Sequence, residues 1–224
     1  MSKLSEPIAE FLGSMFLVMA AISPVILFTE VLESHISVAL IANALAVAFV
    51  LGALIEMFAP VSGAHFNPVV TLVMLADKKI NAVKAALYIV VQIFGGIIGT
   101  VFTHLMFYNE RGGVFFVSET TRNAYLGEII GTFILVFAIL ILVKVKSSKI
   151  SLFIGLLVGG QIMATSSTMF ANPQVTIARI FTNSASGIRP PDAAIFIVMQ
   201  LIGGLAAYTV YKFMLQERVE NSKK

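Results

Sequence analysis

The stretch that decides the fold is Ser62-Gly-Ala-His-Phe-Asn-Pro-Val-Val-Thr71, and it returns in altered form as Met169-Phe-Ala-Asn-Pro-Gln-Val-Thr176. Asparagine is a favoured helix N-cap, because its side-chain oxygen accepts a first-turn backbone N–H, and proline fits the first helical position. Each copy therefore predicts a short helix, opened by Pro68 in the first copy and by Pro173 in the second. One Asn-Pro alone is typical of an ordinary cap after a loop. Two copies sharing Asn-Pro-x-Val-Thr indicate two half-helices that meet.

The composition indicates a membrane protein. Of the 224 residues, 58% are hydrophobic and only 12% are charged, and the mean hydropathy is +0.94. Soluble domains carry about 25% charged residues. The chain has no cysteine, and its three histidines show no metal-ligand spacing, so neither a metal site nor a cofactor is expected. The basic residues lie beside apolar segments, which indicates membrane topology and not nucleic-acid binding.

Six stretches are long and apolar enough to cross a bilayer, which takes about 20 residues. The half-helix that starts at Asn67 lies between the second and third stretches, and the one that starts at Asn172 lies between the fifth and sixth. We therefore predict an all-α membrane protein with six transmembrane helices and two re-entrant half-helices. The predicted spans are 8–28, 36–58, 82–107, 123–143, 150–169 and 192–214.

Two motifs occur once in each half of the chain: Glu10-x-x-Gly recurs as Glu128-x-x-Gly, and Gln92-x-x-Gly-Gly recurs as Gln200-x-x-Gly-Gly. They indicate one channel domain, 1–224, built from two repeats, 8–108 and 123–215. Each repeat has an odd number of spans, so the second inserts upside down. Inverted repeats with broken helices place a solute site at the midplane between them. The paired glycines predict close helix packing.

Lysine and arginine are distributed unequally between the two sides of the predicted topology. Eleven lie on the side of the chain ends and four on the other side, which predicts that both termini are cytoplasmic. The eleven are Lys3, Lys78, Lys79, Lys84, Lys144, Lys146, Lys149, Lys212, Arg218, Lys223 and Lys224; the four are Arg111, Arg122, Arg179 and Arg189.

Over nearly its whole length the chain resembles the aquaporin and aquaglyceroporin family, also called major intrinsic proteins. The resemblance is carried by Ala9-Glu-Phe-Leu-Gly13, by the stretch from Ser62 to Pro68 and by the second Asn-Pro, in matching order and spacing. It implies the aquaporin fold in the cell membrane and a homotetramer with one pore per subunit. It also implies passive passage of small neutral solutes and no enzymatic activity.

The resemblance also implies roles for particular residues. Asn67 and Asn172 would donate to the solute at the pore midplane, where the positive ends of the half-helices repel cations. Glu10 and Glu128 would hold the loops before the half-helices; the alternative for a carboxylate inside a span is a lumen residue or an ion relay. A ladder of pore carbonyls would come from Gly63, Ala64, His65, Thr168, Met169 and Phe170.

The departures from the family pattern concern the selectivity filter. Val175 stands where an arginine is usual, Val47 where an aromatic residue is usual, and Gly160 where water-selective members carry histidine. With Met169 these residues predict a wide, mostly apolar ring that admits glycerol-like polyols and also water. The second box further resembles members associated with arsenic-resistance operons. That branch implies metalloid acids such as arsenous acid, and methylated arsenicals.

The location of two charged residues, Arg179 and Glu56, can be interpreted in two ways each. Arg179 lies seven residues after Asn172, on the same helix face and about 10 Å further out. It could line the outer mouth of the pore or reach lipid headgroups. Glu56, eleven residues before Asn67, could line the inner vestibule or face a neighbouring subunit.

Three other functions compete with the solute channel. A water-selective aquaporin would pass water alone. A coupled secondary transporter also uses broken helices and inverted repeats, but it needs carboxylates at the breaks, and neither Asn-Pro box carries one. A membrane-junction or scaffold protein would conduct little.

Overall fold

The computed structural model describes residues 4–221, and all regular secondary structure in that part of the chain is helical. Lys3, Lys223 and Lys224, which contribute to the predicted charge bias, lie outside the described residues. In chain order the elements are α1 (Ser5–Ile26), the π-helical turn η1 (Leu27–Val31), α2 (Ile36–Ser62), α3 (Pro68–Ala76), α4 (Ala82–Met106), α5 (Tyr108–Arg111), α6 (Tyr125–Lys144), α7 (Ile150–Ala164), α8 (Pro173–Arg179) and α9 (Pro190–Asn221).

Within residues 4–221, five helices are long and apolar enough to cross a membrane: α1 continued by η1, α2, α4, α6 and α9. The predicted fifth span, 150–169, is shorter than expected, because α7 ends at Ala164 after 15 residues. At 1.5 Å per residue it is about 22 Å long, less than the roughly 30 Å of a bilayer core. Residues 165–171 instead form the loop that leads into α8.

The glycine pairs of the two Gln-x-x-Gly-Gly motifs allow neighbouring helices to pack closely. Helix α1 packs on α4, and α6 packs on α9. A Cβ atom on Gly95 would collide with the Phe11 carbonyl oxygen, and one on Gly203 would collide with the Ile129 carbonyl oxygen. Any larger residue at these positions would therefore push the two helices of a pair apart, as the predicted packing role requires.

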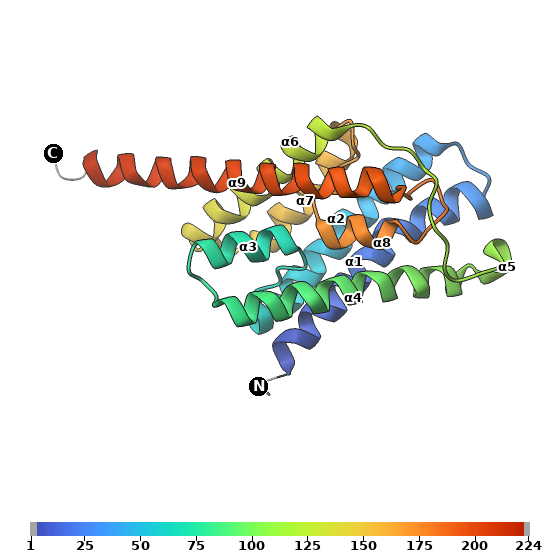
Figure 1. The fold of residues 1–224 in the computed structure, drawn as a ribbon, viewed down its shortest axis with the longest axis horizontal. Helices are drawn as coiled ribbons and strands as arrows, with labels where there is room; N and C mark the ends of the chain where they lie inside the picture. Colours follow the sequence, from blue (N-terminus) through green and yellow to red (C-terminus); the bar gives the residue numbers. More distant parts are fainter. Residues whose placement is uncertain (1–3, 222–224) are drawn as a thin grey trace.

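The short helices α3 and α8 lie in the interior of the bundle, between α4 and α9 (Figure 1). Each begins at an asparagine whose side-chain oxygen accepts a backbone N–H two residues on, Asn67 from Val69 at 2.9 Å and Asn172 from Gln174 at 3.1 Å. A proline then occupies the first turn of each helix. The beginnings of both helices are thus fixed by local capping chemistry.

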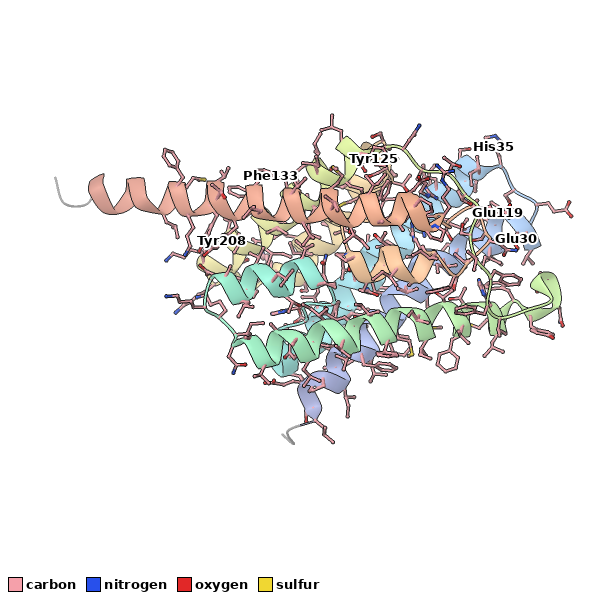
Figure 2. The ribbon with its side chains drawn as sticks, viewed as in Figure 1. Glu30, His35, Glu119, Tyr125, Phe133 and Tyr208 are labelled. Atoms are coloured by element: carbon pink, nitrogen blue, oxygen red, sulfur yellow. The ribbon has the colours of Figure 1, made fainter. Side chains whose placement is uncertain are left out.

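The far end of α3 is attached to α9. The Lys212 ammonium lies 2.7 Å from Asp77 Oδ1, and the Tyr208 hydroxyl donates to the Ala76 carbonyl at 2.9 Å. Figure 2 shows Tyr208 at the end of the bundle where α3 ends, and Glu30, His35 and Glu119 at the opposite end.

Candidate functional site

Asn67 and Asn172 are linked across the point where α3 and α8 begin. Asn67 Nδ2 donates to the Ala171 carbonyl at 2.8 Å. Asn172 Nδ2 donates to the Phe66 carbonyl, also at 2.8 Å. A side-chain amide carries two N–H donors, so each asparagine has a second donor besides the one used in this crossed pair.

Glu10 of α1 binds the loop that precedes α3. Its carboxylate is fully buried and accepts from the backbone amides of His65 at 2.9 Å and Phe66 at 2.8 Å. The Ser62 hydroxyl donates to it at 2.6 Å, and Gln92 Nε2 of α4 donates at 2.8 Å. Four donors on one carboxylate fix the position of the loop, because hydrogen bonds to an ionised acceptor are the strong ones.

The same arrangement recurs around Glu128 of α6. Its carboxylate is fully buried and accepts from the backbone amides of Phe170 at 2.9 Å and Ala171 at 2.8 Å. Gln200 Nε2 of α9 donates to it at 2.5 Å and also to the Thr176 hydroxyl at 2.8 Å. Gln200 therefore joins the second loop, its carboxylate and α8.

Both loops have a left-handed backbone at residues other than glycine. The φ angle is 51° at Ala64 and 46° at Phe66 in the first loop, and 58° at Thr168, 44° at Met169 and 46° at Ala171 in the second. Such residues cost about 1 kcal/mol or more each and persist only where surrounding contacts hold them. The carboxylates supply those contacts, since the backbone amides that donate to them lie at or next to all of these residues except Thr168.

Three cavities follow one another through the bundle. We name the first the arginine cavity, about 340 Å³, the second the central cavity, about 50 Å³, and the third the histidine cavity, about 250 Å³. Helix α2 contributes to all three in order along its length: Ile36, Ser37, Leu40 and Asn43 line the arginine cavity, Val47 and Leu51 the central cavity, and Ile55 and Ala59 the histidine cavity.

The predicted midplane residues and most of the predicted filter line the central cavity. Asn67 and Asn172 do so, together with Val47, Met169 and Val175. The arrangement brings both asparagines and three of the four predicted filter positions to one space.

Gly160 is the exception, and its predicted place in the filter is wrong. It is exposed, and a Cβ atom built on it would meet nothing within 4 Å. On α7 the central cavity is lined by Val158 and Ile162 instead. Two residues turn a helix by about 200°, so Gly160 lies on the side opposite Val158. Gly155 and Gly159, which pack on α2, set this rotation of α7.

The central cavity is lined mostly by apolar side chains, but it is narrow, whereas the sequence predicts a wide ring. At about 50 Å³ it has room for a few water molecules. The cavity is small because large side chains from outside the four predicted filter positions also line it. They are Leu17, Leu51, Leu135, Ile162 and Phe170. Leucines occur throughout the three apolar helices that contribute here, so the sequence does not distinguish those that line the cavity from those in the core. Val158 and Ile162 are four residues apart, and this helical spacing is the one signal that could have placed them on a common face.

The residues of the predicted carbonyl ladder lie along the same path. Gly63, Ala64 and His65 line the histidine cavity. Thr168 lines the arginine cavity, and Met169 and Phe170 line the central cavity. Both loops therefore run beside the cavities.

Arg179 lines both the arginine and the central cavity. Its side chain is buried, with a residue exposure of 5%, and Nη2 donates to the Ala21 carbonyl at 3.0 Å. The guanidinium carbon lies 4.1 Å from the centroid of the Phe170 ring. This burial rules out the headgroup interpretation, because a side chain that reaches lipid headgroups is exposed at its charged end.

Arg122 is a second cation of the arginine cavity, and nothing in the sequence singled it out. Its Nε donates to the Gly187 carbonyl at 2.7 Å and its Nη2 to the Ala185 carbonyl at 2.8 Å. Its guanidinium carbon lies 5.0 Å from the Phe170 centroid. Burial lowers the pKa of Arg122, but a guanidinium starts so high that it stays charged at neutral pH.

Glu56 lies outside all three cavities. It is exposed on α2 and accepts a hydrogen bond from the Ser151 hydroxyl of α7 at 2.5 Å. Both residues line an open groove between α2 and α7 on the outside of the bundle, with Phe49, Leu152 and Leu156. Of the two interpretations, the vestibule is therefore excluded by the structure.

The helical bundle, the two half-helices meeting at paired asparagines and the succession of cavities define a membrane channel of the broken-helix class. The family model described as "Major intrinsic protein" matches residues 1–170, which ends just before Asn172. The aquaglyceroporin AqpS of Rhizobium meliloti is 35% identical over 93% of this chain and 89% of its own length. The probable aquaporin TIP3-2 of Arabidopsis thaliana is 31% identical over 79% and 68%.

A solved structure has the same fold. The aquaglyceroporin of Plasmodium falciparum aligns with a TM-score of 0.73 at 20% identity, over 98% of this chain and 99% of that one. The chain belongs to the major intrinsic protein family. It is a multi-pass membrane channel with the aquaporin fold and not an enzyme, which confirms the predicted fold class.

Proposed function

We propose that the protein is a passive channel for small uncharged solutes of glycerol size, and that water passes with them. The observation that carries this is the central cavity, in which two asparagine donors face apolar walls and Val175 stands in place of the usual arginine. The similarity to an aquaglyceroporin over 93% of the chain supports the size class. Because the cavity is narrow, the side chains that line it must shift as a glycerol-sized solute passes.

The donors and the half-helix ends decide which solutes enter. Asn67 and Asn172 each offer a second N–H, which suits hydroxyl oxygens. The helices α3 and α8 both start at this point, and a helix N-terminus carries roughly half a positive elementary charge. Cations are therefore repelled where a neutral polyol is bound. Neutral metalloid acids such as arsenous acid present the same hydroxyl groups, so they and methylated arsenicals are further candidates.

Replacing Asn67 or Asn172 by alanine is expected to lower glycerol flux several-fold. Each change removes a donor to the solute and a cap worth about 1 kcal/mol. Asn81 provides the matched control, because its side chain caps α4 by accepting from the Lys84 amide but lies outside the three cavities. Light-scattering traces of liposomes containing each variant give the rates. If both pore variants conduct glycerol at the rate of Asn81→Ala, these asparagines do not line the path.

We also propose a homotetramer with both termini in the cytoplasm. The charge bias supports this orientation, and the family resemblance supports four subunits. The exposed Glu56–Ser151 pair lies in a groove among apolar side chains. A carboxylate that faces lipid is costly, so this groove is better covered by a neighbouring subunit than by lipid. The chain has no cysteine, so a single cysteine at Ser148 or Thr121 reports sidedness cleanly. Labelling of Ser148→Cys from outside intact cells would contradict the proposed orientation. Cross-linking that yields only monomers would contradict the proposed tetramer.

A further inference from the structure

Two guanidinium groups share the arginine cavity. Arg122 and Arg179 both line it, and both lie over the ring of Phe170, at 5.0 and 4.1 Å from its centroid. They reach the cavity from different parts of the chain, Arg122 from the segment before α6 and Arg179 from the last turn of α8. Two like charges held this close to one space raise its affinity for an anion.

Arg179 keeps donors that the protein does not use. Of its five N–H groups, one donates to the Ala21 carbonyl at 3.0 Å. Its Nε is buried and has no hydrogen-bond partner among the residues that the structure describes. A buried donor without an acceptor is costly, so an acceptor supplied by a ligand would be bound with a gain. The side chain lines the cavity, so a ligand there can contact the guanidinium, while Nε itself is covered by protein atoms and would need a small shift to be reached.

The carboxylates nearby are occupied elsewhere. Glu128 accepts from the amides of Phe170 and Ala171 and from Gln200. Asp192 accepts from the Arg122 backbone amide at 2.7 Å and forms an ion pair with Arg189 at 2.8 Å. Among the described residues that line the arginine cavity there is no acidic side chain; its other polar members are Ser37, Asn43, Thr168 and Ser186. Positive charge is therefore in excess there.

We propose that the arginine cavity is a binding site for a small oxyanion, such as a carboxylate. A guanidinium fork matches the two oxygens of such a group, whereas a halide offers one point of contact. The cavity, at about 340 Å³, has room for a small carboxylate. Entry into the central cavity, which holds about 50 Å³ and is lined mostly by apolar side chains, would strip the anion of its water, so the anion binds at the mouth of the pore without passing and competes there with solute.

Calorimetric titration of the purified channel with sodium formate and sodium acetate tests the site without requiring flux. We expect saturable binding of both, with sodium chloride at equal ionic strength binding more weakly. Arg179→Gln should weaken formate binding at least about tenfold, since a hydrogen bond to a charged group is lost. Arg179→Lys, which keeps the charge but not the fork, should weaken it by a smaller factor.

Arg189→Gln is the matched control. It removes a positive charge near the same end of the pathway, but Arg189 does not line the cavity, so formate affinity should stay within about twofold of the parent value. Equal weakening by Arg179→Gln and Arg189→Gln would overturn the site, and so would chloride that binds as well as formate. If no arginine variant folds, an absence of saturable formate binding to the parent still refutes the proposal. Formate binding by a protein that passes no glycerol would contradict only the proposed function.

Discussion

Replacing Glu128 by alanine is expected to destabilise the protein by about 3–5 kcal/mol, a large share of the 5–15 kcal/mol typical of a folded domain. The change leaves the amides of Phe170 and Ala171 and the side chain of Gln200 without their shared acceptor in a buried site. The left-handed backbone at Met169 and Ala171 would also lose the contacts that hold it. The loop before α8 should then loosen, and solute flux should fall with it.

The measurement is the melting temperature of the detergent-solubilised variant, compared with Glu119→Ala. Glu119 is exposed and lies at the periphery of the bundle, in the segment between α5 and α6 (Figure 2). We expect a fall of about 10 °C for Glu128→Ala and less than about 2 °C for Glu119→Ala, using the usual conversion for chains of this length. Equal melting temperatures for the two variants would show that the carboxylate does not hold the loop. Glu10→Ala should behave as Glu128→Ala does.

Introducing arginine at Val175 is expected to reduce glycerol flux at least about tenfold and water flux much less. Val175 lines the central cavity of about 50 Å³, and the arginine adds several heavy atoms and a charge to it. Residues four apart share a helix face, so the new charge would also lie beside Arg179. An added barrier of about 1.4 kcal/mol is enough for a tenfold loss of rate.

Val175→Leu separates bulk from charge in the same assay. If the leucine variant loses as much glycerol flux as Val175→Arg, the filter acts by size alone. If Val175→Arg conducts glycerol like the parent, Val175 is not at the narrowest point of the path. Arg179→Ala adds a third arm: unchanged solute selectivity and ion leakage in that variant would show that Arg179 does not guard the mouth.

The parts of the structure that could be predicted are those set by local chemistry. Asn67 and Asn172 predict where their helices begin, because capping depends on the neighbouring residues alone. The second copy of the motif supports the interpretation of the first. The recurrence of Glu10 and Gln92 as Glu128 and Gln200 indicates two repeats, and in the structure Gln92 donates to Glu10 as Gln200 donates to Glu128. A repeated motif is a strong signal because one structural reason must explain both copies.

The rotation and length of α7 could not be predicted. The expectation for Gly160 rests on an offset counted back from Asn172, which assumes a particular helix rotation. In this chain the packing of Gly155 and Gly159 against α2 sets the rotation, and Val158 and Ile162 face the cavity. Packing between helices far apart in sequence decides such details, and the apolar pattern of a span is nearly uniform around the helix.

Arg122 shows the same limit. It precedes a span, where arginine is common as a topological signal, so no feature of the sequence places it in a cavity. Only the return of the chain at Ala185 and Gly187 brings carbonyl acceptors to its guanidinium. Arg179, in contrast, could be placed on the face of Asn172 from its spacing, because both lie in one short helix.

The central claim is that the parent channel passes neutral solutes larger than water. Stopped-flow light scattering of liposomes that contain the purified protein, with outward water flux and inward glycerol, urea and arsenous acid flux recorded in parallel, tests it most directly. We expect glycerol to enter well above the rate of protein-free liposomes, without saturating early and without a proton gradient. Water flux with no glycerol, urea or arsenous acid above that background would contradict the account.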